Sequence, residues 1–382
     1  MRLAAVLTIA VLAGLAAVTP ATAAKREVPR GFFGANWNFE VVKSSPSTQD
    51  STWGRMAESG VEAQRLTFFW SHAQPNPGDP TDFSETDAKV TLAVSHGIEL
   101  LPVIAFGPRW ARESDAPHSP PSGVGYSAYA SYLNDLVGRY GPSGSFWPAH
   151  PELPYRPIRV WQIWNEPAAA YQWDVSPGED WAKSYGKLLR YSYYAIKDAD
   201  AEAKVVLAGL ANRSDRDLDY LYKAGKIHGY FDVAALHPYT VQPGGVVTLI
   251  KRFRKVLKKH GDNNKQVWLT EFGLPAGKGK SGIKSTLQTD DAGMARFLRR
   301  SYGEMIANRQ WHSLRVTHMY WFTWASRYSR GGRGWIFDWS GLLRYRKKSG
   351  QDVFSTKPAL GECRKLARSA EGCAKTSTGA CA

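Results

Sequence analysis

Eight short apolar runs alternate with longer amphipathic segments along this chain, and this alternation limits the possible folds more than any other feature. Apolar runs of this length are typical of buried strands, whereas apolar residues spaced three and four apart are typical of helices. The expected helices include Thr86–His96, Tyr126–Tyr140, Trp181–Asp198, Val247–Lys259 and Asp290–Asn308. The expected strands are Phe32–Asn36, Val61–Thr67, Glu99–Ala105, Ile158–Ile163, Lys204–Ala208, Phe231–Leu236, Gln266–Thr270 and Leu314–Trp321.

Strands that alternate with helices indicate a parallel sheet, and eight repeats indicate closure into a barrel. We therefore predict an α/β fold, a single (β/α)8 TIM barrel with long loops on the C-terminal face of the strands. A doubly wound open sheet is the alternative, but no Gly-x-Gly-x-x-Gly follows the first strand. The longest stretches without a pattern are Ser71–Phe83, Gly107–Gly125 and Ala325–Ser355, and we expect them to be irregular loops.

The first 24 residues read as a secretory signal peptide. A basic start is followed by the apolar run Leu3–Val18 and by an Ala-x-Ala ending at Ala21 and Ala23. The apolar run is shorter than the ~20 residues that a membrane-spanning helix needs. We expect a secreted, extracellular protein that has no membrane contact after cleavage. Residues 25–366 would form the catalytic barrel, and residues 367–382 a short tail.

The chain of 382 residues is 43% hydrophobic, so it can build a large core, and it has a net charge of +15. Positive charge attracts polyanions, which leaves an acidic polysaccharide as a possible ligand. The basic run Lys251–Lys259 has apolar residues at helical spacing, which favours an ordinary solvated helix face. A polyanion-binding protein is an alternative that a steep salt dependence of binding would identify. The signal peptide argues against a nucleic acid partner.

The cysteines all lie near the C-terminus, at Cys363, Cys373 and Cys381. Secretion permits a disulfide in the tail, and an odd number leaves one thiol over, so the pairing stays open. No histidine lies near these cysteines, so we expect no metal site there.

Polar and aromatic residues stand where the predicted strands end. In a parallel barrel these ends meet on one face, where active sites form. The residues are Asn36, Arg65, Asn165, Glu166, His237, Tyr239, Glu271, Trp321 and Trp324.

Glu166 and Glu271 provide the two carboxyl groups that glycoside hydrolysis requires, one to protonate the leaving oxygen and one to stabilise or attack the anomeric carbon. A cation favours the ionised form of a neighbouring carboxylate, so Arg65 beside Glu271 would make Glu271 the nucleophile. Glu166 would then keep a raised pKa and act first as acid and later as base. Arg65 could instead pair with a structural acid.

The remaining candidates would bind the sugar or support the carboxylates. The amide of Asn165 can hydrogen-bond a sugar 2-hydroxyl. His237 and Tyr239 point the same way because they are two residues apart on a strand, and the Tyr239 hydroxyl could orient Glu271. His237 could equally be a structural histidine. Trp321 or Trp324 would offer a flat ring for stacking against sugar, and we expect Asn36 to contact substrate as well.

Three motifs resemble the signature of the retaining (β/α)8 glycoside hydrolases of clan A: Trp164–Pro167, His237–Tyr239 and Leu269–Gly273. The resemblance implies that Glu166 is the acid/base and Glu271 the nucleophile, with retention of configuration and no metal cofactor. It also implies sugar-binding roles for Arg65, Asn165, His237 and the tryptophan of the eighth strand.

The segment Pro102–Ala111 is similar to the third-strand region of family 39 and its relatives. Many family 5 cellulases carry a histidine where this chain has Phe106–Gly107, so a cellulase is disfavoured. The aromatic-rich loops favour an endo-acting enzyme, because an extended glycan needs several stacking subsites. We therefore predict a monomeric secreted glycosidase, without a cofactor, that degrades a β-linked polysaccharide or oligosaccharide. An exo-acting β-glycosidase such as a xylosidase, or a carbohydrate-binding protein without catalysis, are the alternatives.

Overall fold

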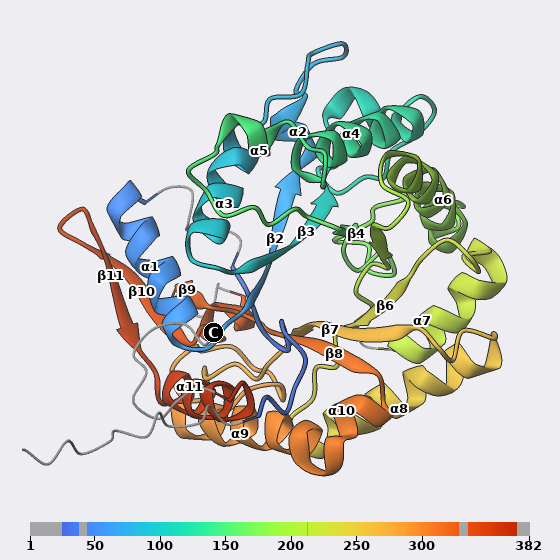
Figure 1. Cartoon of the computed structure of the whole chain (residues 1–382). Coiled ribbons are helices and arrows are strands. Elements are labelled where there is room, and N and C mark those ends of the chain that lie inside the picture. The colour runs from blue at the N-terminus through green and yellow to red at the C-terminus, as the bar shows by residue number, and fades with distance from the viewer. Residues whose placement is uncertain (1–24, 38–43, 212, 328–334, 373–382) are drawn as a thin grey trace, which may run out of the picture.

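The computed structural model describes residues 25–37, 44–211, 213–327 and 335–372. Eight parallel strands close into a barrel in chain order, as Figure 1 shows, and confirm the predicted (β/α)8 fold. The strands are β1 Phe33–Asn36, β2 Ala63–Phe69, β3 Glu99–Ala105, β4 Val160–Ile163, β5 Lys204–Val206, β6 Val233–Leu236, β7 Gln266–Phe272 and β8 Val316–Trp321.

Helices surround the barrel as an outer ring (Figure 1). Their starts follow local sequence signals, for example the Asp180 side chain, which accepts hydrogen bonds from the first backbone N–H groups of α6. The α-helices are α1 Pro46–Glu58, α2 Trp70–Ala73, α3 Ser84–Ser95, α4 Gly125–Tyr140, α5 Phe146–Ala149, α6 Trp181–Ala199, α7 Ser214–Tyr220, α8 Pro243–Lys259, α9 Asp291–Ile306, α10 Gln310–Ser313 and α11 Pro358–Ala370. Short 3-10 or π turns lie at η1 Arg109–Ala111, η2 Leu221–Gly225, η3 Ala307–Arg309 and η4 Ile336–Trp339.

The barrel interior is filled by a compact apolar cluster, so the barrel is a packed core and not a pore. Side chains alternate along each strand, so one set points inward and the other packs against the helices. The inward cluster consists of Ala63, Leu101, Val206, Val233, Ala235, Trp268 and Tyr320. Nearer the carboxyl ends of the strands, the side chains that point into the barrel are polar.

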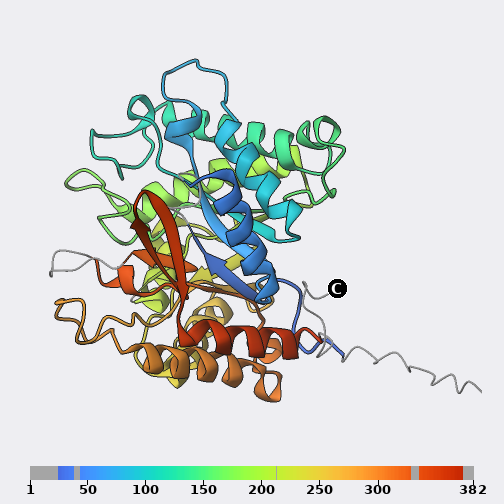
Figure 2. The same ribbon diagram turned by 90° about the vertical axis from the view of Figure 1, so that its left-hand side faces the viewer.

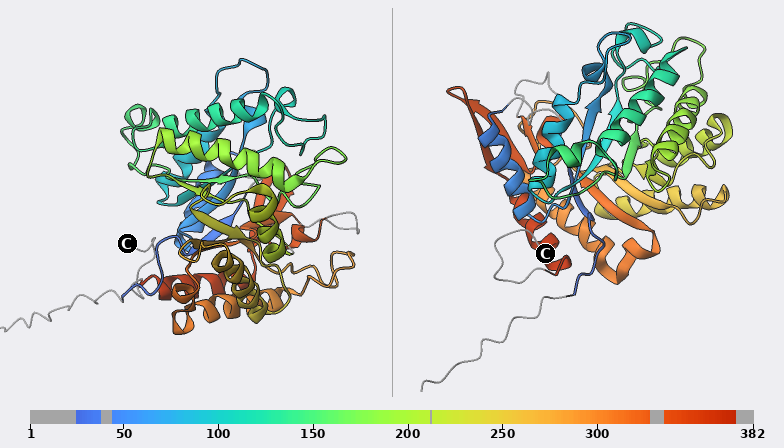
Figure 3. Two further views of the ribbon diagram at one scale, coloured as in Figure 1. Left: turned by 90° about the vertical axis from the view of Figure 1, so that its right-hand side faces the viewer. Right: turned by 45° about the horizontal axis from the view of Figure 1, so that its top comes forward.

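The two ends of the barrel differ. The loops that follow the strands extend from one end, and the amino-terminal residues and the end of α11 lie at the other (Figures 2 and 3). At the latter end, the Arg26 guanidinium pairs with Glu62 at 2.5 Å, and Arg30 pairs with Glu99 at 2.7 Å. These ion pairs hold the amino-terminal segment against the barrel. The loop end is therefore the place for a functional site.

The prediction of an irregular stretch at Ala325–Ser355 is wrong. Three strands lie there, β9 Ala325–Arg327, β10 Leu343–Lys348 and β11 Gln351–Thr356, and they form a separate sheet in the order β11-β10-β9. Ser349 and Gly350 both have positive φ, as a two-residue hairpin turn requires. The many charged residues of β10 concealed this hairpin, because they interrupt the expected apolar run.

The predicted boundary at residue 366 falls inside α11, where Ala367 and Ala370 are buried. The barrel therefore continues past it. Cys363 is also buried in α11. Residues 1–24 and both Cys373 and Cys381 lie outside the described residues, so the signal peptide and the tail disulfide stay predictions. Among the described helices, none has the length and apolarity to cross a membrane.

Candidate active site

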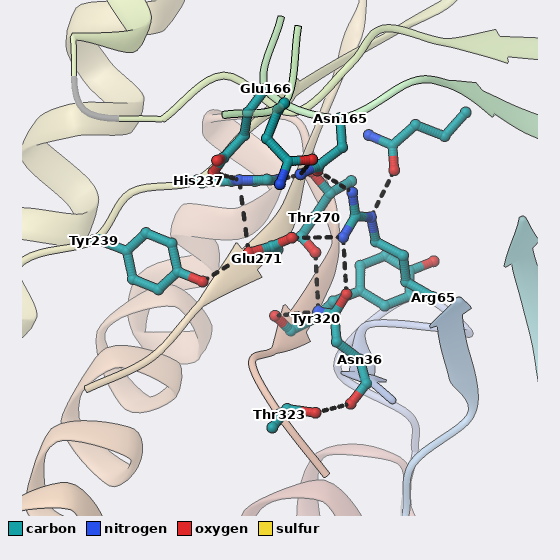
Figure 4. A network of polar contacts seen from close by, with 12 residues as sticks. Asn36, Arg65, Asn165, Glu166, His237, Tyr239, Thr270, Glu271, Tyr320 and Thr323 are labelled. Atoms are coloured by element: carbon teal, nitrogen blue, oxygen red, sulfur yellow. Dashed lines mark hydrogen bonds and ion pairs between the residues drawn. The ribbon is translucent and has the colours of Figure 1, made fainter. Parts of the chain in front are cut away.

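One polar network joins residues on or just after five strands, and Figure 4 shows it from close by. It contains seven of the nine predicted site residues, which come from β1, β2 and β7 and from the segments after β4 and β6. They are Asn36, Arg65, Asn165, Glu166, His237, Tyr239 and Glu271.

Arg65 is the centre of this network, and it is only 3% exposed. Its Nη1 donates to Glu271 Oε1 at 2.7 Å and to Asn36 Oδ1 at 2.9 Å. Its Nη2 donates to Asn165 Oδ1 at 2.6 Å, and its Nε to Gln162 Oε1 at 2.6 Å. The rigid fork of a guanidinium therefore fixes three amides and one carboxylate at once. The predicted partnership of Arg65 with Glu271 is confirmed.

Glu271 reaches the mouth because β7 contains a register shift where it pairs with β8, between Leu269 and Phe272. A bulge of this kind re-aims side chains, so two successive residues can face the same side. The Thr270 hydroxyl meets the imidazole of His237 at 3.1 Å, and the next residue, Glu271, bonds Arg65. Regular alternation would have turned one of these two side chains outward.

The backbone around Glu166 is held in an uncommon conformation. Trp164 has φ 65° and Glu166 has φ 43°, a region that costs non-glycine residues free energy. The Glu166 N–H donates to the Gly209 carbonyl at 3.1 Å, and the Trp164 indole N–H to the Gln172 carbonyl at 2.7 Å. These contacts hold the turn that presents the carboxyl group of Glu166 to the mouth.

Both carboxylate oxygens of Glu166 have partners. Nδ1 of His237 lies 2.6 Å from Oε1, and the Tyr171 hydroxyl donates to Oε2 at 2.7 Å. A Cβ atom at Gly209 would lie 1.9 Å from Nε2 of His237, so only glycine leaves room for the imidazole. Tyr171 is 60% exposed. Sequence reasoning missed Tyr171, Gln162 and Gly209, because none of them carries a recognisable pattern.

The expectation of a raised pKa for Glu166 is wrong for the free protein. Burial by itself would raise the pKa of Glu166, but the hydrogen bond and charge of His237, the Tyr171 hydroxyl and the charge of Arg65 outweigh it and lower this pKa below its usual value. Burial and the charge of Glu271 raise the pKa of Tyr239 well above its usual value. Tyr239 therefore keeps its proton and donates to Glu271 Oε2 at 2.8 Å.

One oxygen of Glu166, one of Glu271 and one nitrogen of His237 lie within 4.8 Å of one another. Such a group could hold a metal ion. However, the fixed cation Arg65 and the donors Tyr239 and Tyr171 already hydrogen-bond these carboxylates. These hydrogen bonds account for the arrangement as two closely spaced carboxylates.

The structure contradicts the predicted stacking roles of Trp321 and Trp324, because each side chain has 0% of its surface exposed. Tyr320 points into the barrel, so alternation turns Trp321 outward, where its ring packs against Phe272 at 5.3 Å. The indole N–H of Trp321 donates to the Ser340 carbonyl at 3.1 Å. Neither ring presents a face to a sugar.

Other aromatic side chains stand near the carboxylates instead. Phe337 packs against Tyr239 with a centroid distance of 4.8 Å, and Trp335 packs against Phe337 at 4.8 Å. On the ends of β2 and β3, the partly exposed rings of Phe69 and Phe106 stack at 5.7 Å. The sequence shows aromatic residues in the segment after β8. It does not show which side chains at the end of β8 point into the barrel and which point outward.

Residues 156–343 match the family model described as glycosyl hydrolase catalytic core. The matched range contains both Glu166 and Glu271. A search of curated proteins found no match to this sequence.

Solved structures share the fold at low sequence identity. A family 39 glycoside hydrolase from the gut symbiont Bacteroides cellulosilyticus WH2 aligns with a TM-score of 0.65 and 17% identity, over 90% of this chain and 65% of that chain. A monomeric β-xylosidase from Caulobacter crescentus CB15 aligns with a TM-score of 0.63 and 17% identity, over 90% and 69%. A GH39 enzyme from Xanthomonas axonopodis pv. citri gives 0.62 and 16%, over 90% and 67%.

This chain thus spans roughly two thirds of the length of these structures, 65% in the first case. The likeness to these structures confirms the predicted (β/α)8 barrel fold. The catalytic-core match covers the ends of β4 and β7, where Glu166 and Glu271 lie, as the motifs predicted.

Proposed function

We propose that this protein is a secreted, retaining glycoside hydrolase that cleaves internal bonds of a β-linked polysaccharide, with Glu271 as nucleophile and Glu166 as acid/base. The observation that carries the proposal is the spacing of the carboxylates, since oxygens of Glu166 and Glu271 lie within 4.8 Å of each other. Retaining enzymes keep their carboxyl groups about 5–5.5 Å apart, whereas inverting enzymes leave roughly 6.5–9.5 Å for a water molecule.

In the first step a carboxylate oxygen of Glu271 attacks the anomeric carbon, and the bond to the glycosidic oxygen breaks as Glu166 donates a proton to it. In the second step Glu166 removes a proton from water, and the water oxygen displaces Glu271 from the covalent ester. Arg65 and Tyr239 each hydrogen-bond one oxygen of Glu271, so the nucleophile is oriented before substrate arrives.

Glu166 needs a proton at the moment of bond cleavage, although its pKa is lowered in the free protein. His237 lies 2.6 Å from its Oε1, which allows a proton to be shared between imidazole and carboxyl group. A leaving unit that enters beside Oε2 has to displace the Tyr171 hydroxyl. Loss of that hydrogen bond removes one of the contacts that lower the pKa of Glu166, so substrate binding itself favours the acid form.

Aromatic rings on more than one side of the carboxylate pair support cleavage within a chain. Phe69 ends β2 and Phe106 directly follows β3, whereas Phe337 and Trp335 follow β8. Exposed lysines on the loop after β7, Lys278 and Lys284, favour an acidic polysaccharide. An exo-acting enzyme is the second candidate, because one similar structure is that of a β-xylosidase.

Digestion of a panel of neutral and uronate-containing glycans, with product analysis, tests the proposal. We expect oligosaccharide products from at least one β-linked polymer, and none with Glu271→Gln, which serves as the inactive control. Release of monosaccharides alone would exclude the endo mode. Equal turnover of neutral and acidic glycans at low salt would exclude a preference for acidic substrates. Binding without any cleavage after long incubation would overturn the assignment of catalysis.

A further inference from the structure

The segment after β8 carries a row of aromatic rings that begins at the nucleophile and ends at the surface. The Tyr239 hydroxyl donates to Glu271 Oε2 at 2.8 Å, and the Tyr239 ring packs against Phe337 at 4.8 Å. Phe337 packs in turn against Trp335 at 4.8 Å, and Phe322 contacts both of these rings at 5.7 Å. Each ring lies in contact with the next, so the row is continuous.

The outermost ring is open to solvent although it is large and apolar. Trp335 is 55% exposed, whereas Phe322 is 8% exposed and Phe337 is partly exposed. Aromatic side chains usually bury most of their area, and an exposed indole beside an active site is a surface on which a ligand can stack.

The segment that presents Trp335 is fixed on a rigid support. The Asp338 carboxylate accepts from the Trp335 backbone N–H at 3.2 Å, and this contact closes the η4 turn. The Trp339 carbonyl accepts from the Lys357 ammonium at 2.7 Å and from the Ala276 N–H at 3.1 Å. Because Lys357 is buried, the turn is tied to the barrel and not only to its own loop. The position of Trp335 is therefore defined before any ligand binds.

We propose that Trp335, supported by Phe337 and Phe322, forms a sugar-stacking subsite for a glycan unit beyond the one that Glu271 attacks. This inference rests on the proposed function, because that function supplies the carbohydrate. Two ring contacts separate Trp335 from Tyr239, so the attacked sugar above Glu271 does not reach Trp335, and a neighbouring unit of the same chain does. The flat faces of sugars carry C–H groups that pack on an indole, while their hydroxyls stay solvated at the edges.

The test compares Trp335→Ala with the parent protein on two substrates. One is the polymer cleaved in the glycan panel, and the other is the p-nitrophenyl glycoside of the same single sugar. We expect kcat/KM for the polymer to fall roughly tenfold, as the loss of one aromatic contact implies. Turnover of the single-sugar glycoside should stay within about twofold of the parent value, since that substrate does not extend to Trp335.

Two controls make the comparison specific. Tyr194 on α6 has the same exposure, 55%, and Tyr194→Ala should leave both substrates unaffected. Trp335→Phe keeps a ring and should recover most of the polymer activity. An unchanged polymer rate in Trp335→Ala would overturn the subsite, and so would an equal loss on both substrates, which would show that Trp335 only supports the reacting centre. Absence of any glycan cleavage by the parent protein would instead overturn the proposed function.

Discussion

The surroundings of Glu271 and Glu166 differ in rigidity, although the two residues have the same side chain. Glu271 lies between the buried Arg65 and the half-buried Tyr239, and each of them bonds one of its carboxylate oxygens. Glu166 is held on one oxygen by the buried imidazole of His237 and on the other by Tyr171, which is 60% exposed. One carboxylate is therefore fixed for attack, while the other can change a hydrogen-bond partner when a substrate enters.

The same contrast extends to the backbone. Glu271 is presented by a bulge inside a regular strand, and Glu166 by a turn with positive φ at Trp164 and Glu166. Strain of this kind persists only where neighbours enforce it. The strand bulge needs the pairing of β7 with β8, and the turn needs the pairing of Asn165 with Gly209.

The strongest test of the comparison removes each carboxylate in turn. Glu271→Gly should lower turnover of an aryl glycoside by roughly 10⁴-fold or more, because no covalent intermediate can form. Glu166→Gly should lower glycan cleavage by roughly 10²–10⁴-fold, with a smaller loss for an aryl glycoside whose leaving group needs no proton. The rates with both substrates are the measurement.

Added azide then separates the two roles. Azide should restore Glu271→Gly by direct attack and give a glycosyl azide of inverted configuration. It should intercept the covalent intermediate of Glu166→Gly and give a product of retained configuration. The opposite pattern, read from the anomeric signals by NMR, would exchange the two assignments.

A smaller effect is expected from crowding the imidazole that supports Glu166. Gly209→Ala places a Cβ atom 1.9 Å from Nε2 of His237, so the ring has to move away from Glu166 and Thr270. We expect kcat to fall about 10²-fold, as a displacement of about 1 Å in an active site can cause. Gly303→Ala is the matched control, because a Cβ atom at this position on α9 meets nothing within 4 Å. Equal activity of the two variants would show that His237 does not act through Glu166.

The smallest effect should come from the hydroxyl on the exposed side of Glu166. Tyr171 lowers the pKa of Glu166, so Tyr171→Phe should raise this pKa toward its usual value. Activity falls as pH rises through the pKa of a required acid, so the alkaline limb of kcat/KM should move to higher pH, with at most a few-fold change at its maximum.

Tyr155→Phe is the control for that profile. Tyr155 is 61% exposed, close to the value for Tyr171, and its hydroxyl donates to the Pro142 carbonyl instead of to the active site. A profile of Tyr171→Phe that superimposes on that of Tyr155→Phe would show that Tyr171 does not influence the proton on Glu166.

Much of the barrel could be predicted because its signals are local. Strand β3 was expected at Glu99–Ala105 and lies there, since an apolar run flanked by amphipathic helices has few other interpretations. Glu271 was expected to follow its strand but lies inside β7, which continues to Phe272. The hairpin of β10 and β11 was missed because its pairing depends on a Ser-Gly turn and on cross-strand contacts such as Tyr345 with Phe354.

The alternation of strands and helices, and the presence of Asn165–Glu166 and Glu271 near strand ends, could be read from the sequence, because period and spacing are properties of neighbouring residues. Which side chains face inward, and what they contact there, depends on the folded chain. The fold turns Trp321 away from the mouth, brings Thr270 and Glu271 to the same side and places the Tyr171 hydroxyl against Oε2 of Glu166. These features could not be predicted because they depend on contacts between residues far apart in the chain. Such contacts decide where a strand bulges, which side chains of a strand face inward and which charges surround a carboxyl group.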